Sequence, residues 1–274
     1  MTHESFAPSG VVSFLTDFGL RDPYVGQMHA VALACDPGLR LVDLCHHAPP
    51  QDVGVASFWL ERCLRFFAPG VVHVVVVDPG VGSERRAILA QARGQVFVAP
   101  DNGVLSRVID GQSACWEIDA GRLGIDVASR TFHGRDLFTP VAARIAAGLL
   151  RPDAVGPSVA PMAAASHVAA PTRDGDDVVG RVLFVDHFGN LVTNLESAQI
   201  AQAQSVRVGN TTISIRGTYA DAAEGELVAL VSSMGTLEIA VRNGSAAARL
   251  GVGAGDEVRA TLLDAGDEVR AKRD

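Results

Sequence analysis

The feature that most constrains the fold of this chain is a run of four valines that ends at an acid. The run, Val74–Val77, opens the stretch VVVVDPGVGSERR at positions 74–86. A strand with one exposed face alternates apolar and polar side chains, so an unbroken apolar run predicts a strand that is buried on both faces. Such strands are typical of parallel sheets that are covered by helices. Asp78 follows directly, so the buried strand ends at a carboxylate.

Strand and helix patterns alternate around this run over the first ~150 residues. Apolar residues at helical spacing follow Asp22, which we expect to be an N-cap, with Pro23 at the first helical position. Further helices are expected over residues 52–67 and 139–150. Strands are expected at residues 11–16, 39–44, 73–77, 87–92 and 95–100. The alternation predicts an α/β fold, with an N-terminal, mostly parallel sheet and flanking helices.

The composition changes after this region. Residues 151–177 are rich in proline and small side chains, and the helical pattern then gives way to short β patterns. One of them contains the two-residue hairpin turn Gly209-Asn210. We therefore expect a C-terminal all-β, barrel-like domain. The expected organisation is an α/β domain at 1–155, a linker at 156–177 and a β domain at 178–274.

Composition also narrows the class of protein. The 274 residues carry a net charge of −8 with no basic run, which argues against a nucleic-acid surface. No apolar stretch is long enough for a membrane span, and the first residues do not have the pattern of a signal peptide. The four cysteines form no CxxC pair, which is typical of buried thiols in a reducing compartment. A cytoplasmic protein is expected.

Metal and cofactor motifs are not evident. His46 and His47 are adjacent, so their side chains would point to opposite faces of a strand and cannot both bind one metal ion. The chain has no HxH or HExxH motif and no P-loop, and its GVGAG segment does not lie between a strand and a helix. We expect neither a metal nor a cofactor.

Acids follow three of the predicted strands, at the ends where parallel α/β sheets bind ligands. They are Asp17, Asp78 and Asp101. A single acid after a strand is often only a helix cap or a turn former. Asp78 stands out because Pro79 and Gly80 allow a tight turn that can bring Arg85 back towards it. From these residues alone, the pair is either a buried ion pair that locks the loop or a charged pocket.

Two further segments carry suitable chemistry. In TFHGRD (131–136), His133 follows Phe132 and stands directly beside a glycine, where a ligand can approach closely, although a lone histidine is more often structural than catalytic. In VDHFGNLVTNL (185–195), Asp186, Phe188 and Asn190 offer an acid, an aromatic face and an amide. These groups suit an ammonium, a stacked base and a hydrogen-bonding edge, although a β-turn with a core phenylalanine explains the segment equally well.

Six motifs, taken in order, resemble one known family. They are FLTDFGLRDPYVGQMHAV, VVDPGVGSERR, VAPDNGVLS, TFHGRDLFTPVAA, VDHFGNLVTNL and LEIAVRNGSAA. This order is similar to that of the S-adenosylmethionine (SAM) hydroxide adenosyltransferases, adenosine-forming SAM hydrolases related to fluorinases and chlorinases. The resemblance spans about residues 11–262. It implies a homotrimer whose SAM sites lie between the N-terminal domain of one subunit and the C-terminal domain of the next.

The resemblance also implies an activity and a set of site residues. The activity is hydrolysis of SAM to adenosine and L-methionine, by metal-free attack of water or hydroxide at the ribose C5′. The catalytic triad would be Asp78, Arg85 and His133, with the choice of base left open among them. The implied substrate-binding residues are Asp17 at the ribose diol, Asp22 and Asp186 near the methionine ammonium, Phe188 and Asn190 beside adenine, Val241 at the adenine edge, and Phe132, Ser233 and Glu238.

Two departures from the fluorinase pattern bear on the activity. The fluorinase halide loop is Tyr-Pro-Ala-Thr, whereas this chain has Asp78 and Val81 at its first and last positions. A carboxylate there would repel a halide ion. Met234 stands where fluorinases have the arginine that binds the methionine carboxylate. A SAM-dependent halogenase and a non-catalytic sensor of SAM or adenosine are the alternatives to a hydrolase.

Overall fold

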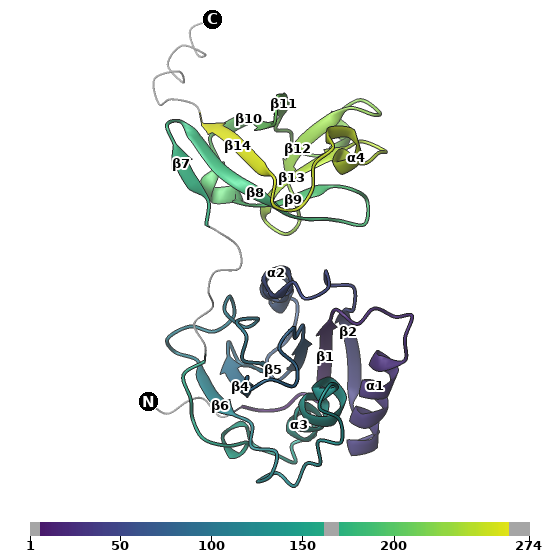
Figure 1. Cartoon of the computed structure of the whole chain (residues 1–274). Helices are drawn as coiled ribbons and strands as arrows, with labels where there is room; N and C mark the ends of the chain where they lie inside the picture. Colours follow the sequence, from purple (N-terminus) through teal and green to yellow (C-terminus); the bar gives the residue numbers. More distant parts are fainter. Residues whose placement is uncertain (1–5, 162–169, 263–274) are drawn as a thin grey trace, which may run out of the picture. The chain divides into compact units, whose positions relative to one another are not determined.

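The computed structural model describes residues 6–161 and 170–262 (Figure 1). The chain divides into two compact units, Met1–His167 and Val168–Asp274, and each is described by itself. Within the described residues, no helix combines the length and the apolar character that crossing a membrane requires.

The first unit is built on one mixed, six-stranded sheet with the order β2-β1-β3-β5-β4-β6. The pairs β1–β2, β1–β3 and β3–β5 are parallel, while β4 pairs antiparallel with both β5 and β6. The predicted parallel core of the sheet is therefore confirmed. The strands are β1 (Val11–Thr16), β2 (Arg40–Cys45), β3 (Val72–Val76), β4 (Ala87–Ala92), β5 (Gln95–Pro100) and β6 (Ala114–Glu117).

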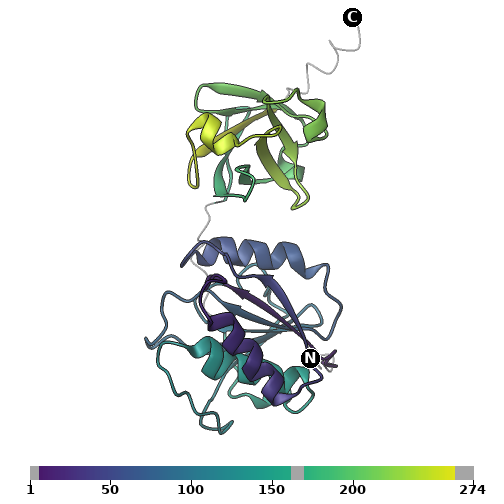
Figure 2. The same cartoon turned by 90° about the vertical axis from the view of Figure 1, so that its right-hand side faces the viewer.

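Helices cover both faces of this sheet (Figures 1 and 2). On one face, α1 and α3 pack over a core that includes Val74 and Val76. On the other, α2 packs over a core that includes Val75 and Val77. The valine run thus divides its side chains between two cores, as its unbroken apolar pattern predicts. The helices are α1 (Tyr24–Cys35), α2 (Val53–Leu64) and α3 (Thr139–Ala146), with the π-helical η1 (Gly134–Phe138) before α3 and the 3₁₀ turn η2 (Pro152–Ala154) after it.

Three helix boundaries differ from the sequence-based expectation, and one of them is the end of α2, at Leu64 instead of residue 67. Helix α1 begins at Tyr24 with Pro23 in the N-cap position, so the prediction that Asp22 caps it is wrong. The Pro23 carbonyl accepts the first helical bond, from Gln27, and leaves Asp22 in an exposed turn. Helix α3 ends at Ala146, four residues earlier than expected, and the chain then turns through Gly148 at φ +72°.

The second unit is an antiparallel, barrel-like sheet with the order β11-β10-β14-β8-β9-β13-β12, and β7 pairs with β8. A bridge between Ile215 and Ala229 links its two ends, so the predicted barrel is nearly closed. The predicted turn at Gly209-Asn210 is confirmed, because Val208 pairs with Thr211. The strands are β7 (Thr172–Asp174), β8 (Asp177–Val185), β9 (Leu191–Glu196), β10 (Ala203–Val208), β11 (Thr211–Ser214), β12 (Leu227–Val231), β13 (Thr236–Val241) and β14 (Glu257–Leu262).

This unit also holds elements that the sequence pattern did not reveal. One is the short helix α4 (Ala246–Leu250), which Ser245 caps by accepting from the Ala248 N–H. The others are the 3₁₀ turns η3 (Ser197–Gln199) and η4 (Tyr219–Asp221). Part of the expected linker is ordered as well. The carbonyl of Pro157 and the N–H of Val159 bond to β6, and β7 lies near the end of the segment.

Candidate active site

A cavity of about 240 Å³ lies at the carboxyl ends of β1 and β3 in the first unit. These strands are neighbours in parallel register, with Thr16 opposite Val76, so the acids that follow them come close together. This edge of a parallel sheet is where α/β proteins bind ligands. The cavity is lined by Asp17, Phe18, Gln51, Val76, Asp78, Pro79, Val81, Thr131, Phe132, His133 and Gly134.

Asp78, Arg85 and His133 form a continuous hydrogen-bonded group at this cavity. The Arg85 Nε lies 2.8 Å from each Asp78 carboxylate oxygen, and its Nη2 also contacts Asp78 Oδ2. The same Nη2 lies 2.9 Å from His133 Nδ1. The side chains of Arg85 and Asp78 are only 9% and 4% exposed. Of the three, Asp78 and His133 line the cavity, so the guanidinium lies behind them.

The hydrogen bonds fix the tautomer of His133. A guanidinium group only donates, so His133 Nδ1 must accept the bond from Arg85. In the neutral imidazole the proton is then on Nε2. Burial lowers the pKa of His133, and the positive charge of Arg85 lowers it further, against the smaller opposing effects of Asp78 and Asp136. The imidazole is therefore neutral at physiological pH.

Glycines in the loop after β3 bring Arg85 back to Asp78. Gly82 has φ +80°, and a Cβ atom there would lie 3.1 Å from the Arg130 carbonyl oxygen, so only glycine fits without strain. The Ser83 hydroxyl donates to the Gly80 carbonyl at 2.7 Å and closes the turn. The loop therefore reverses within a few residues. Of the two interpretations of this stretch, the structure shows a buried ion pair that is also part of a pocket wall.

The other predicted acids of the first unit lie in different settings. Asp17 lines the cavity, and its Oδ2 accepts from the Gln51 N–H at 2.8 Å. Asp22 is exposed and is not among the lining residues. Asp101 is buried in an ion pair with Arg86 and does not line the cavity either.

Aromatic rings complete the wall beside Asp17. The rings of Phe18, Tyr24 and Phe132 meet edge to face, with centroids 5.4–6.0 Å apart. Gly134 allows this packing, because a Cβ atom there would lie 3.3 Å from the Phe132 ring. Sequence reasoning included Phe132 but missed Phe18, Gln51 and Thr131. For Phe18 and Thr131 a signal existed, since Phe18 directly follows Asp17 and Thr131 opens the TFHGRD segment. Gln51 comes from a loop without a recognisable pattern.

A second cavity, of about 600 Å³, lies in the β unit. It brings together three of the predicted residues, Phe188, Asn190 and Val241. Phe188 is 74% exposed, so it is not the core residue of the alternative interpretation. Tyr219 belongs to this wall and was missed by sequence reasoning. The cavity is lined by Phe188, Asn190, Tyr219, Ala220, Val241, Arg242, Asn243 and Gly244.

Asp186 shapes this cavity from the turn between β8 and β9. Its Oδ1 accepts from the backbone N–H groups of Phe188 and Asn190, at 2.9 and 2.8 Å, and its Oδ2 accepts from the Asn190 side chain at 3.0 Å. Gly189 packs so closely on Ser245 that a Cβ atom would lie 2.2 Å from the serine Oγ. The turn is thus locked, and Asp186 fixes where Phe188 and Asn190 point.

The last two predicted residues of the β unit differ from each other. Glu238 is 5% exposed and lies behind the wall, where the Tyr219 hydroxyl donates to its Oε1 at 2.5 Å. Burial raises the pKa of Glu238, and the charge of Asp186 adds to the increase, while the bond from Tyr219 opposes it. Ser233 is exposed in the turn between β12 and β13 and lines neither cavity.

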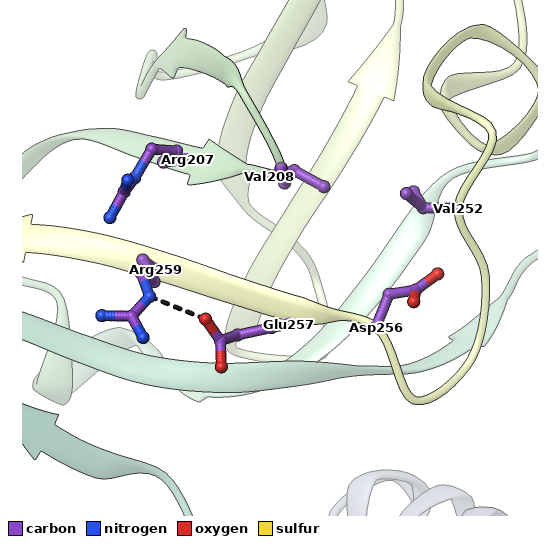
Figure 3. A pocket seen from close by; sticks show the side chains of 7 residues that line it. Arg207, Val208, Val252, Asp256, Glu257 and Arg259 are labelled. Atoms are coloured by element: carbon purple, nitrogen blue, oxygen red, sulfur yellow. Dashed lines mark hydrogen bonds and ion pairs between the residues drawn. The ribbon is translucent and has the colours of Figure 1, made fainter.

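A third cavity, of about 280 Å³, lies on the outer surface of β10 and β14 (Figure 3). Its arginines are already neutralised: Arg259 bonds to Glu257 and to Asp174, both at 2.7 Å, and Arg207 lies 3.5 Å from Asp177. It is therefore a weaker candidate than the first two cavities. It is lined by Arg207, Val208, Gly209, Val252, Asp256, Glu257 and Arg259.

The fold and these cavities define a class: a two-unit protein with a charged Asp–Arg–His group on a parallel sheet and an aromatic and amide wall on a β barrel. Comparison with known proteins specifies it further. Residues 12–156 match the SAM hydroxide adenosyltransferase N-terminal domain, and residues 180–259 match the C-terminal domain of the same family. The chain belongs to the SAM hydroxide adenosyltransferase family.

Individual relatives agree with this assignment. A protein of Salinispora tropica named (R)-S-adenosyl-L-methionine hydrolase is 40% identical over 93% of this chain and 99% of its own length. A Thermus thermophilus protein of the same name is 39% identical over 90% of this chain and 98% of its own length. The crystal structure of an uncharacterized conserved protein from Thermotoga maritima matches with a TM-score of 0.83 and 36% identity. The match covers 91% of this chain and 99% of that one. Relatives named fluorinase are more distant. One of them, from Nocardia brasiliensis, is 27% identical over 84% of this chain and 89% of its own length.

The tautomer of His133 leads to a testable prediction. In the Arg85→Ala variant, loss of the neighbouring positive charge and easier access of water should both raise the pKa of His133. The measurement is an NMR titration of the His133 ring resonances. Glu84→Ala is the matched control, because Glu84 is an exposed charge in the same loop. An unchanged or lower pKa in Arg85→Ala would contradict the arrangement.

Proposed function

We propose that this protein hydrolyses S-adenosyl-L-methionine to adenosine and L-methionine, by attack of water on the ribose C5′. The observation that carries the proposal is the Asp78–Arg85–His133 group at the cavity on the parallel sheet. The family to which the protein belongs supports the same reaction, since relatives at about 40% identity bear the name (R)-S-adenosyl-L-methionine hydrolase.

The chemistry requires little beyond an oriented water molecule. Methionine leaves a sulfonium as a neutral thioether, so the leaving group needs no proton and no general acid. The attacking water must be aligned with C5′ and must lose a proton as the C–O bond forms. The products are then adenosine, methionine and one proton. No step of this substitution requires a metal or a cofactor.

We assign these tasks to the three residues from their geometry. His133 offers its Nε2–H to the water oxygen, because its Nδ1 is occupied by Arg85. Asp78 faces the same cavity and takes the proton, since its oxygens can accept further hydrogen bonds beside those from Arg85. Arg85 acts as a positioning residue that holds both partners. Among the three candidates for the base, we therefore assign Asp78.

Substrate binding is proposed to use both cavities. Asp17 accepts hydrogen bonds from the ribose diol, with Phe132 beside it. Phe188 stacks on the adenine, while Asn190 and the backbone at Val241 bind its edge. In this assignment Asp186 acts mainly through the turn that it fixes. The negative charges of Asp186, Asp22 and Glu238 favour the methionine ammonium group. Ser233 also contacts the methionine end of the substrate.

We further propose that the site is assembled in a homotrimer, between the α/β unit of one subunit and the β unit of the next, in the cytoplasm. The division of the site residues between two units supports this. In addition, the cavity of about 240 Å³ in the first unit is smaller than the roughly 300–1,000 Å³ typical of small-molecule sites, so it needs a second wall.

The triad is tested by SAM hydrolysis with purified variants. Asp78→Ala, Arg85→Ala and His133→Ala should each lower kcat by at least about 100-fold, because the water is no longer held. The exposed loop variant Glu84→Ala should retain full activity. The double variant Asp78→Asn/Arg85→Met removes both buried charges together, so it should remain folded by circular dichroism and still be inactive.

Three outcomes of this assay would contradict the proposal. Full activity in all single variants would exclude the triad. Halide-dependent formation of 5′-halo-adenosine would indicate a halogenase. Tight binding of SAM without turnover would indicate a sensor. The assay should compare both sulfonium epimers of SAM, since the relatives' name specifies an (R) form.

The role of the β unit is tested by a matched pair of exposed phenylalanines. Phe188 is 74% exposed and Phe66 is 75% exposed, so replacing either by alanine should change the free energy of unfolding by only about 0.5 kcal/mol or less. Phe188→Ala should nevertheless raise the KM for SAM about tenfold, through lost stacking on the base. Phe66→Ala should leave KM unchanged. An equal effect of the two variants would remove Phe188 from the site.

A further inference from the structure

Two histidines and an aspartate converge at one edge of the α/β sheet, on residues that the proposed function does not use. His29 lies on α1, Asp43 on β2, and His46 directly after β2. Asp43 Oδ1 lies 2.8 Å from His29 Nε2 and 2.9 Å from His46 Nε2. All three ligand atoms lie within 4.8 Å of one another. Sequence reasoning considered His46 only with His47, which is exposed, and missed the partners that the fold supplies.

The setting of His46 distinguishes this cluster from an ordinary surface ion pair. His46 is 3% exposed, and its Nδ1 lies 2.8 Å from the Thr16 hydroxyl. Its Nε2 has no hydrogen-bond partner among the residues that the structure describes, although Asp43 Oδ1 is close. The two atoms, His46 Nε2 and Asp43 Oδ1, are therefore within hydrogen-bonding distance, but the angles between them are not those of a hydrogen bond. Metal-binding histidines typically have their other ring nitrogen held by a hydrogen-bonding group, as Thr16 holds Nδ1 here, and this leaves Nε2 as the atom directed at the cluster.

We propose that His29, Asp43 and His46 bind one divalent transition-metal ion, for which Zn²⁺ is the reference. Two imidazoles and a carboxylate are a donor set that Zn²⁺ prefers, and Ni²⁺ or Cu²⁺ also suits them. The side chains of Asp43 and His29 are 44% and 26% exposed, so an ion can enter and keep a water ligand.

The separations of the ligand atoms are compatible with such an ion. Metal–ligand bonds of about 2.0–2.2 Å in tetrahedral geometry place neighbouring ligand atoms about 3.3 Å apart. The observed separations of 2.8 and 2.9 Å must therefore open by about half an ångström. Rotation of the Asp43 side chain can provide this change, because it is the most exposed of the three.

The site would stabilise the loop that leads to the active-site cavity. Besides its contact with His46, the Thr16 hydroxyl accepts from the Phe18 N–H at 3.2 Å. The Gly19 N–H donates to the His46 carbonyl at 2.6 Å. An ion on His46 would therefore fix the segment that contains Asp17. The proposed role is structural and adds no step to the hydrolysis, so it does not depend on the proposed function.

The test measures metal content and affinity rather than activity. Tag-free, full-length protein is stripped with a chelator, equilibrated with Zn²⁺, gel-filtered and analysed by elemental mass spectrometry, and its affinity is measured by calorimetry. We expect about one Zn²⁺ per chain, with at least about tenfold weaker binding in His29→Ala and Asp43→Asn. His47→Ala is the matched control and should bind as the unchanged protein does.

Two results would overturn the proposal. One is a wild-type protein that retains less than about 0.2 Zn²⁺ per chain. The other is equal affinity in His29→Ala, Asp43→Asn and His47→Ala. Either would identify the cluster as two histidines in contact with Asp43 that bind no ion. Circular dichroism verifies that each variant is folded. The visible spectrum of bound Co²⁺ in the wild-type protein gives a second readout that does not rely on any variant. Because adenosine release plays no part, failure here is distinguishable from failure of SAM hydrolysis.

Discussion

The Asp78–Arg85 ion pair is the interaction on which the proposed chemistry depends. It is almost fully buried, so removing either charge would leave the other uncompensated at a cost of several kcal/mol. The pair also determines the state of His133, because the guanidinium occupies Nδ1 and keeps the proton on Nε2. One arginine thus holds both groups that face the cavity. The same carboxylate that would repel a halide is the group that can accept a proton from water.

The rest of the α/β unit keeps this group rigid. The valine run divides its side chains between the two cores, so the strand before Asp78 is held from both faces. The glycine turn then returns Arg85 within seven residues of Asp78. In the β unit, Asp186 plays a comparable part by fixing the turn that carries Phe188 and Asn190. In both units, a loop between two strands thus places some of the candidate site residues: Asp78 and Arg85 in one, Phe188 and Asn190 in the other.

Features that depend on residues close together in the sequence could be predicted from it, whereas contacts between residues far apart in the sequence could not. The buried valine strand, the Asp78 loop and the Gly209-Asn210 turn are encoded by neighbouring residues, and each was predicted. The contact of Arg85 with His133 spans 48 positions, so only the resemblance to a family could suggest it. The role of Asp186 in its turn, and the partners of His46, depend on hydrogen-bond geometry that no sequence pattern encodes. The first residue of a helix is also hard to predict from sequence. Asp22 was expected to be the N-cap of α1, but Pro23 occupies that position.

The central claim is that a water molecule held by Asp78 and His133 attacks the ribose C5′. The most direct test is a reaction with SAM in water enriched in ¹⁸O, with mass analysis of the products. The account predicts that adenosine carries the label in its 5′-hydroxyl group and that methionine carries none. Unlabelled adenosine, or the label on an amino-acid product that has lost its sulfur, would show that the nucleophile or the bond broken is a different one.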